Sequence, residues 1–500
     1  MGARVLNLAN IIEGHAADSV ALISRNRETT YGALREQVAA LRGGLAGLGL
    51  GKGDRIALLL GNNRHFVVSY LAVVGLGAVA VPLNPTSPGH EIERELSAVG
   101  ALAAVVGPTA IPSWRNVDTS KAPTLRHVVA IEGELDGAIP LDDLITSAPM
   151  AAVDVDSDDL AVLVFTSGTA GAPRAAMLSH GNLLANIEQA DASDSRMEPN
   201  DVVYGVLPMF HIFGLNVVLG IALHAGATVV LVQRFDPSTA LETIRDRKVT
   251  VVPGAPPMWV AFSMFDDAPA DAFAGVRSAS TGAAKMPEEA IRRLEERFGL
   301  SLEEGYGLTE ASPVVTSSRG IPIKVGSVGR VLDGMQVRLV DESGEDMLDG
   351  DAGEIWVRGP NVFQGYLDDP VTTARVLTKD GWLRTGDIAV TDADGYLYLI
   401  DRAKDLIIVS GFNVYPKEVE DVLMEYPGVA EVGVIGVPHP HTGEAVKAFV
   451  VAEPGVHLDE DALIDHCLEE LARYKCPSKI LFVDQLPRNV TGKLLRRELM

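Results

Sequence analysis

Apolar runs alternate with amphipathic stretches through most of the chain. The runs RIALLL, FVVSYLAVVGLGAVAVPL and AAVVG follow one another from residue 55, with an acidic amphipathic stretch before the last. The same alternation of apolar and helical stretches recurs at 227–232, 240–248, 249–254 and 288–299. Strands that alternate with helices in this way predict layered α/β sheets, in which ligand loops lie at the carboxyl ends of the strands.

The pattern changes from residue 330 onward. Short alternating strands, MQVRLVD, GEIWVRG and GYLYLIDR, are separated by acidic glycine-containing turns and predict a small β-rich subdomain. The segment DRAKD at 401–405 then joins this body to a last stretch with its own periodic elements. We therefore expect an α/β multidomain protein with a large N-terminal domain at 1–400, a hinge at 401–405 and a small mobile α+β lid domain at 406–500.

The composition is that of a globular protein. The 500 residues are 47% hydrophobic and 22% charged and include 49 glycines, which argues against disorder. No apolar stretch is long enough to cross a bilayer, and the N-terminus lacks the pattern of a secretory signal. We expect a cytoplasmic protein without a transmembrane segment, and leave peripheral membrane contact and a homodimer open.

The formal net charge is −25. Such an acidic chain is a poor partner for nucleic acid, so we expect none, and an anionic ligand needs a local basic site. One candidate is the stretch 471–500, in which seven Lys and Arg residues stand against two acids; a solvated helix face explains that stretch equally well. Cys467 and Cys476 match neither a zinc site nor a redox motif, so we expect both to be structural.

The most informative segment is LVFTSGTAGAPR at 163–174. An apolar run stops at hydroxyl side chains, glycines and one cation, a combination that can hold phosphate because glycines expose backbone N–H groups to an anion. The segment is neither a Walker loop nor a dinucleotide fingerprint. Taken alone, it is explained equally well as an ordinary turn after a buried strand.

Four further motifs follow in order. EEGYGLTE at 303–310 places Tyr306 between glycines, where we expect an exposed ring that can stack on a base, and the Thr and Glu that follow offer a hydroxyl and a carboxylate. GWLRTGD at 381–387 ends in an acid that could accept hydrogen bonds from ribose, and DRAKD and PRNVTGK come next. Each is weak alone, because strand ends, Asp turns and surface lysines explain them as well.

Together, in this order and at these separations, the motifs resemble those of the adenylate-forming superfamily of acyl-CoA synthetases, luciferases and peptide-synthetase adenylation domains. The resemblance extends over essentially the whole chain. It implies an ATP-dependent acid–thiol ligase that forms an acyl-adenylate, releases pyrophosphate and transfers the acyl group to CoA, with Mg²⁺ bound. It also implies that the small domain turns about Lys404 between the two half-reactions and brings Gly411 to the thiol channel.

The resemblance assigns roles residue by residue. Lys493, His211, Thr309 and Glu310 match catalytic positions, and Thr166 and Glu310 match positions close to the metal. The candidate nucleotide- and cofactor-binding residues are Thr166, Ser167, Gly168, Thr169, Ala170, Gly171, Arg174, Gly282, Ala283, Ala284, Glu304, Gly305, Tyr306, Gly307, Thr309, Asp387, Ile400, Arg402, Lys404, Gly411 and Lys493. Among these, Tyr306 matches the residue near adenine, Asp387 and Arg402 match the ribose pair, and Lys493 matches the lysine that bridges carboxylate and α-phosphate.

Residues near 210 indicate which class of acid the protein accepts. Where peptide-synthetase domains place an Asp, this chain has Phe210 and His211, which disfavours an amino acid. Gly214 and Gly305 leave room for a longer chain, and PGAPPMWVAF at 253–262 is expected to form an apolar wall. We expect a hydrophobic monocarboxylate, with a medium- or long-chain fatty acid favoured over an aryl acid.

The phosphate segment departs from the family's usual pattern at Ala170, Arg174 and Ala175. Arg174 keeps a cation but not the geometry of lysine, so either a slower adenylation or an altered nucleotide pose is expected. The alternatives left open are an acyl-AMP ligase that loads a carrier protein, an aryl-CoA ligase, a luciferase-like oxygenase and a degenerate adenylate-binding module. The compact segment between GYGLTE and GEIWVRG favours CoA over a carrier protein as acceptor.

Overall fold

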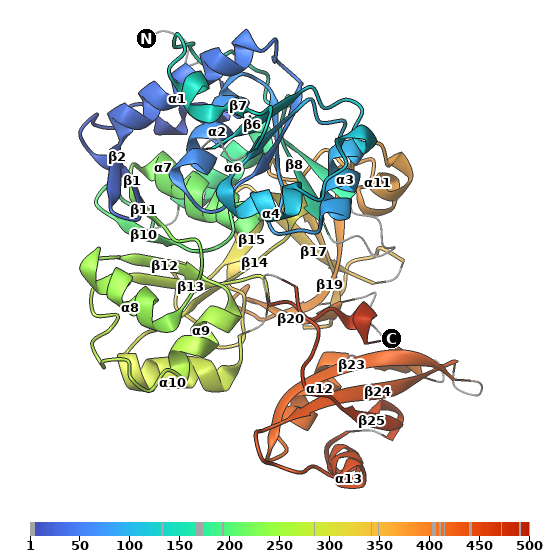
Figure 1. Ribbon diagram of the computed structural model, residues 1–500. Helices are drawn as coiled ribbons and strands as arrows, with labels where there is room; N and C mark the ends of the chain where they lie inside the picture. The colour runs from blue at the N-terminus through green and yellow to red at the C-terminus, as the bar shows by residue number, and fades with distance from the viewer. Residues whose placement is uncertain are drawn as a thin grey trace.

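The computed structural model describes residues 6–131, 135–166, 174–192, 195–284, 286–341, 343–348, 350–402, 407–409, 412–414, 416–439, 443–471, 473–489 and 492–499. These residues form two large mixed sheets, a smaller antiparallel sheet and a separate C-terminal sheet (Figure 1). This architecture confirms the α/β multidomain fold predicted from the sequence. Among the described residues, no helix is long and apolar enough to span a bilayer.

The first sheet has seven strands in the order β7-β6-β5-β3-β4-β8-β9. Its strands are β3 (Arg55–Leu59), β4 (Val79–Pro82), β5 (Ala103–Val106), β6 (His127–Ala130), β7 (Ile139–Pro140), β8 (Leu160–Thr166) and β9 (Arg174–Ser179). Its neighbouring helices are α1 (Tyr31–Gly47), α2 (Arg64–Gly75), α3 (Gly89–Ala98), α4 (Ile111–Trp114), α5 (Leu141–Ile145) and α6 (His180–Asp191). All neighbouring strands are parallel except β8 and β9, which form a hairpin across the phosphate segment.

The long apolar run at 66–83 is divided between α2 and β4. Helix α2 is almost wholly buried, because the apolar residues surround its axis instead of following one stripe. Gly77, with φ +71°, allows the chain to leave the helix and enter the strand. The periodicity of an all-apolar run cannot separate a buried helix from a buried strand, so only the structure defines this boundary.

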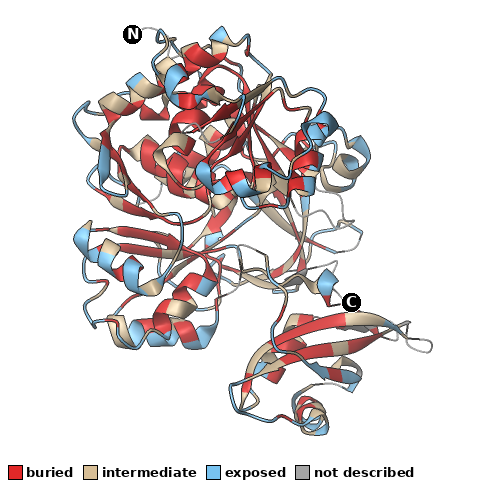
Figure 2. Cartoon of the chain, in the orientation of Figure 1, coloured by how far each residue is buried: buried red, intermediate tan, exposed pale blue. Residues whose placement is uncertain are grey.

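The second sheet has nine strands in the order β16-β15-β14-β13-β12-β10-β11-β1-β2. Its strands are β1 (Val20–Ser24), β2 (Arg27–Thr30), β10 (Val202–Gly205), β11 (Thr228–Leu231), β12 (Val251–Gly254), β13 (Ser278–Thr281), β14 (Glu303–Gly307), β15 (Val314–Ser317) and β16 (Arg330–Val331). The helices of this part of the chain are α7 (Ile221–Ala225), α8 (Pro237–Asp246), α9 (Pro256–Ser263) and α10 (Glu288–Phe298). Trp259 and Phe262 of α9 are fully buried in the core. Figure 2 shows the buried residues concentrated in the sheets and on the inner sides of the helices.

The third sheet is antiparallel and carries β17 (Gln336–Val340), β18 (Gly353–Arg358), β19 (Leu383–Thr391) and β20 (Leu397–Arg402), with α11 (Pro370–Val376) between β18 and β19. The C-terminal unit contains β21 (Ile407–Val409), β22 (Phe412–Val414), β23 (Val429–His439), β24 (Gly443–Ala452), β25 (Lys479–Phe482), α12 (Pro416–Met424) and α13 (Glu460–Glu470), and has its own apolar core. It lies beside the large body, at the red end of the colour scale (Figure 1).

Candidate functional site

A cleft of about 1380 Å³ lies where the sheets and the C-terminal segment meet. Most of the predicted site residues that the structure describes line it: Thr166, Arg174, His211, Gly282, Ala283, Glu304, Gly305, Tyr306, Gly307, Thr309, Glu310, Asp387 and Lys493. Ala284 and Ile400 are described but are absent from its wall. Ser167, Gly168, Thr169, Ala170, Gly171, Lys404 and Gly411, and the side chain of Arg402, lie outside the described residues.

The two ends of the phosphate segment are held together by strand pairing. Thr166 pairs with Arg174 across the β8–β9 hairpin, and the Arg174 Nε lies 3.3 Å from Oδ2 of Asp369. The guanidinium also lies 6.0 Å from the ring centroid of Tyr366. Asp369 caps the first turn of α11 by accepting a hydrogen bond from the Thr372 N–H. The cation that replaces the family's lysine is therefore fixed at one side of the cleft by an acid and a ring.

Tyr366 holds the candidate metal ligand Glu310. Its hydroxyl donates a 2.6 Å hydrogen bond to Oε1 of Glu310. Burial raises the pKa of Tyr366, and the neighbouring Glu310 carboxylate raises it further, so the hydroxyl stays protonated and can donate. The sequence reasoning missed Tyr366, although its glycine–tyrosine pair at 365–366 repeats the pattern of the GYG motif at 305–307.

The candidate magnesium site is built from oxygen donors. Glu310 and Thr166 both line the cleft, and Mg²⁺ in nucleotide enzymes is commonly bound by one or two protein oxygens together with substrate phosphates. Within the described part of the chain, no group of three or more His, Cys, Asp and Glu residues is arranged to hold a metal. The donor set thus fits a nucleotide-bound Mg²⁺ better than a protein-only metal cage.

Tyr306 and Asp387 are joined directly. The Tyr306 hydroxyl donates a 2.6 Å hydrogen bond to Oδ2 of Asp387, and each residue is only 7% exposed. The expectation of an exposed Tyr306 ring was wrong: the ring packs against the main apolar core of the large domain and still lines the cleft. The contact ties β14 to β19, so that the candidate adenine and ribose residues are fixed relative to one another.

His211 is half-buried in the wall of the cleft. Its Nδ1 lies 3.3 Å from the Phe213 backbone nitrogen and accepts a hydrogen bond from it. Burial, with a smaller effect from the positive charge of Lys493, lowers the pKa of His211 to about 4. The imidazole is therefore neutral at physiological pH and does not add a second cation beside Lys493.

Lys493 reaches the cleft on a tight turn. Its backbone N–H donates to the Asn489 side chain at 2.8 Å, and its carbonyl accepts from the Asn489 N–H at 2.9 Å. Gly492 has φ +83°, and a Cβ at this position would overlap the Pro257 ring at the start of α9. The glycine of this motif is needed for close approach to the large domain, and that approach brings the lysine into the cleft.

The apolar part of the wall differs from the sequence prediction. Phe210, Phe213, Val217 and Leu332 line the cleft, whereas no residue of 253–262 does. That segment was expected to form an apolar wall but instead packs into the core, where Trp259 donates a 3.0 Å hydrogen bond to the Ser280 carbonyl. Helix α9 in this stretch is apolar on nearly all sides, and its large side chains Met258, Trp259 and Phe262 are buried in the domain interior.

The glycines near the cleft have different roles. A Cβ at Gly214 would collide with the Pro208 carbonyl, so this glycine serves backbone packing and not pocket length, contrary to expectation. Gly305 lines the cleft, as expected. At Gly282 a Cβ would lie 3.5 Å from the Phe213 ring, so this position is close to the ring. Ala283 adopts φ +73°, a conformation that strains a non-glycine residue.

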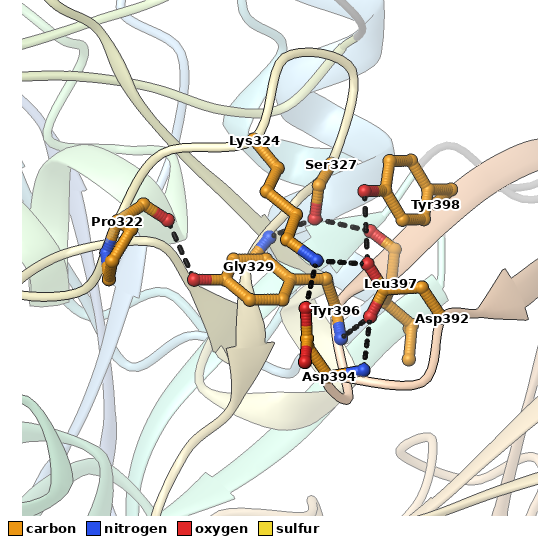
Figure 3. A network of polar contacts seen from close by, with 9 residues as sticks. All are labelled: Pro322, Lys324, Ser327, Gly329, Asp392, Asp394, Tyr396, Leu397 and Tyr398. Carbon is orange, nitrogen blue, oxygen red and sulfur yellow. Dashed lines mark hydrogen bonds and ion pairs between the residues drawn. The ribbon is translucent and has the colours of Figure 1, made fainter.

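A polar cluster lies next in sequence to the cleft-lining residues Ile321 and Arg330 (Figure 3). Lys324 lies 2.5 Å from Asp392 and 2.7 Å from Asp394, and its ammonium sits 4.4 Å from the Tyr396 ring centroid. Tyr396 in turn donates a hydrogen bond to the Pro322 carbonyl at 2.7 Å. These contacts tie the segment before β16 to the β19–β20 hairpin, which precedes the expected hinge.

Comparisons with known proteins agree with this geometry. The family model described as "AMP-binding enzyme" matches residues 9–367, and the model of the C-terminal domain of these enzymes matches residues 418–493. A feruloyl-CoA synthase of Amycolatopsis sp is 38% identical over 94% of this chain and 93% of its own length. A long-chain-fatty-acid–CoA ligase of Salmonella typhimurium is 34% identical over 97% of this chain and 91% of its own.

Among solved structures, ATP-bound MatB from Rhodopseudomonas palustris superposes with a TM-score of 0.92 at 32% identity, covering 99% of this chain and 98% of its own. The matches extend over both domains and include the segments that carry the cleft residues. The chain therefore belongs to the AMP-binding enzyme family, as an adenylate-forming acyl-CoA synthetase whose substrates are ATP and CoA and whose metal is Mg²⁺.

Proposed function

We propose that the protein activates a hydrophobic monocarboxylic acid as its acyl-adenylate and transfers the acyl group to CoA. The observation that carries the proposal is that Lys493, Glu310 and His211 converge on one cleft whose remaining wall includes Phe210, Phe213 and other apolar side chains. The cationic and metal-binding groups can stabilise charge on the phosphates, and the apolar groups provide a place for the body of the acid.

The first half-reaction is chiefly an electrostatic problem. A carboxylate oxygen attacks the α-phosphorus of ATP, and the bond to pyrophosphate breaks, so two anions must approach each other. Mg²⁺, when bound, neutralises charge on the phosphates. Lys493 would bridge the carboxylate and the α-phosphate, and Thr309 would donate to the same phosphate. Neutral His211 would add no charge there.

The second half-reaction needs a thiol in place of the lysine. The CoA thiolate attacks the acyl carbonyl, the bond to AMP breaks, and the thioester forms without a second ATP. We propose that the C-terminal domain, bounded as predicted at 401–405, turns about Lys404 so that Lys493 leaves and the face near Gly411 lines the thiol channel. Asp387 and Arg402 would hold the ribose in both states. The domain would then rotate about a residue that follows these nucleotide contacts in the sequence.

A fatty acid of medium or longer length is the first candidate. The apolar side chains of Phe213 and Val217 in the wall of the cleft and the relative named as a long-chain-fatty-acid–CoA ligase support it. An aryl acid is the second candidate, because the Phe213 ring lies against Gly282, where it can stack on a ring, and because a relative is named as a feruloyl-CoA synthase.

The test is a thioester assay across an acid panel with CoA and, in parallel, with a carrier protein. ATP–pyrophosphate exchange is measured with octanoate, ferulate and an amino acid. The proposal expects exchange with octanoate or ferulate and thioester formation on CoA. Exchange that responds only to the amino acid would overturn it. Absence of pyrophosphate release with every acid tested would support a degenerate adenylate-binding module. Transfer only to the carrier protein would support an acyl-AMP ligase.

A further inference from the structure

Arg174 and Asp369 form an ion pair beside the cleft. The Arg174 Nε lies 3.3 Å from Oδ2 of Asp369, and the two side chains are 23% and 32% exposed, so the contact is partly shielded from solvent. Arg174 lines the cleft together with its strand partner Thr166 and with Tyr366. Asp369 is absent from that wall. The acid therefore contacts the guanidinium without itself lining the cleft.

The turn that starts α11 holds Asp369 in place. Its Oδ1 accepts a 2.9 Å hydrogen bond from the Thr372 N–H. Its carbonyl accepts from the N–H and from the hydroxyl of Thr373, at 3.0 and 2.8 Å. The same hydroxyl accepts a 2.9 Å hydrogen bond from the Tyr366 N–H. Because Oδ1 is used by the cap, Oδ2 is the oxygen that Arg174 approaches, and the turn fixes where that oxygen lies.

The backbone of Arg174 is anchored to the same part of the molecule. Arg174 pairs with Thr166 across the β8–β9 hairpin. The next residue, Ala175, accepts a 2.9 Å hydrogen bond at its carbonyl from the Leu367 N–H. The chain that leads to Asp369 therefore runs beside β9, and both members of the ion pair stand on neighbouring stretches of backbone.

A guanidinium has more donors than this ion pair uses. Arginine carries one N–H on Nε and four on its two Nη groups, in a planar fork. Within the described part of the chain, the Arg174 side chain contacts Asp369 through Nε and lies 6.0 Å from the Tyr366 ring centroid. The Nη donors match the spacing of two phosphate oxygens. A lysine has a single ammonium group, for which the acid and the phosphate would compete.

We propose that Asp369 is a positioning residue for ATP: it holds Arg174 through Nε, so that the Nη groups donate to oxygens of the terminal phosphates. This inference rests on the proposed function, because it concerns how the same site holds ATP. Without the acid, the guanidinium would sample other rotamers, and ordering a long side chain on binding lowers affinity. With the acid, the fork is oriented before the nucleotide binds.

The chain supplies a matched control. DPVT at 369–372 and DPST at 236–239 share one helix-capping motif, and Asp236 caps α8 by accepting a 3.0 Å hydrogen bond from the Thr239 N–H. Asp236 does not line the cleft. Asn caps helices about as well as Asp. Asp369→Asn and Asp236→Asn therefore both keep a cap and remove one negative charge, and only the first removes the partner of Arg174.

The measurement is the Kd of the full chain for ATP and for AMP, by isothermal titration calorimetry. Asp369→Asn is expected to raise the Kd for ATP by about 3- to 10-fold, as loss of a partly shielded charged contact does. The Kd for AMP should stay unchanged, because AMP lacks the terminal phosphates. Asp236→Asn should change neither constant. An unchanged or lower Kd for ATP in Asp369→Asn would overturn the inference, as would an equal rise for AMP or in the control variant.

A second background assigns the effect to Arg174. In Arg174→Lys, the further change Asp369→Asn should cause no additional loss of ATP affinity, because the acid acts through an Nε that lysine lacks. Additive losses would refute the coupling between the two residues. Failure of the wild-type chain to bind ATP would overturn the proposed function itself, whereas ATP binding that does not depend on Asp369 overturns this inference alone.

Discussion

Removing the Tyr366 hydroxyl should weaken Mg²⁺ use without removing the catalytic residues. Tyr366→Phe deletes the 2.6 Å hydrogen bond to Oε1 of Glu310 and keeps the ring, which packs edge-on against Phe363 at 5.0 Å. A hydrogen bond to a charged group contributes about 1.5–3 kcal/mol when buried. Both residues are only half-buried, so we expect about 1–2 kcal/mol, or a factor of 5–30.

The effect should appear in the metal dependence. With Glu310 free to rotate, the Mg²⁺ concentration that gives half-maximal pyrophosphate exchange should rise by about 5- to 30-fold, and excess Mg²⁺ should restore most of the rate. Tyr398→Phe is the matched control, because it removes a hydroxyl that donates to Asp392 at 3.3 Å in the cluster of Figure 3. Equal Mg²⁺ dependence in the two variants would refute the positioning role of Tyr366.

Two further predictions concern Lys493 of the C-terminal domain and the loss of stability at acid pH. Lys493→Ala should lower pyrophosphate exchange by roughly 100-fold or more while a supplied acyl-adenylate still yields the thioester; equal loss of both activities would contradict domain alternation. His180 is buried, accepts a 3.1 Å hydrogen bond from the Leu8 N–H, and has a pKa lowered to about 4 by burial. The unfolded chain binds a proton there below about pH 6.5 and the folded chain only near pH 4, so the free energy of unfolding should fall as the pH drops between these values. For His180→Gln, the free energy of unfolding measured with urea should fall by about 1–3 kcal/mol less than that of the wild type over this pH range. An equal fall in both proteins would show that another group titrates.

Much of the candidate site was predictable because its motifs are local. TSGTAGAPR, GYGLTE and NVTGK each combine backbone conformation and side-chain chemistry within a few residues, and their order along the chain identified the family. Their side-chain partners were not predictable. Tyr366 meets Glu310 across 56 residues of sequence, and Tyr306 meets Asp387 across 81. Such contacts depend on which strands become neighbours and in which register.

The sequence by itself determined the fold class and the reaction class, and most of the described residues that it predicted for the site line the cleft. Alternating apolar and amphipathic periods require layered α/β sheets, and hydroxyls, glycines and cations at fixed spacings suit phosphate chemistry. Only the tertiary structure decided which way long side chains point. It buried Trp259 in the core. It also brought Ser280, Glu303 and Ser317 together in the wall of the cleft, because the pairing of β13, β14 and β15 decides which residues of these strands are neighbours. A single sequence does not reveal that pairing, and the specificity of the acyl site depends on it.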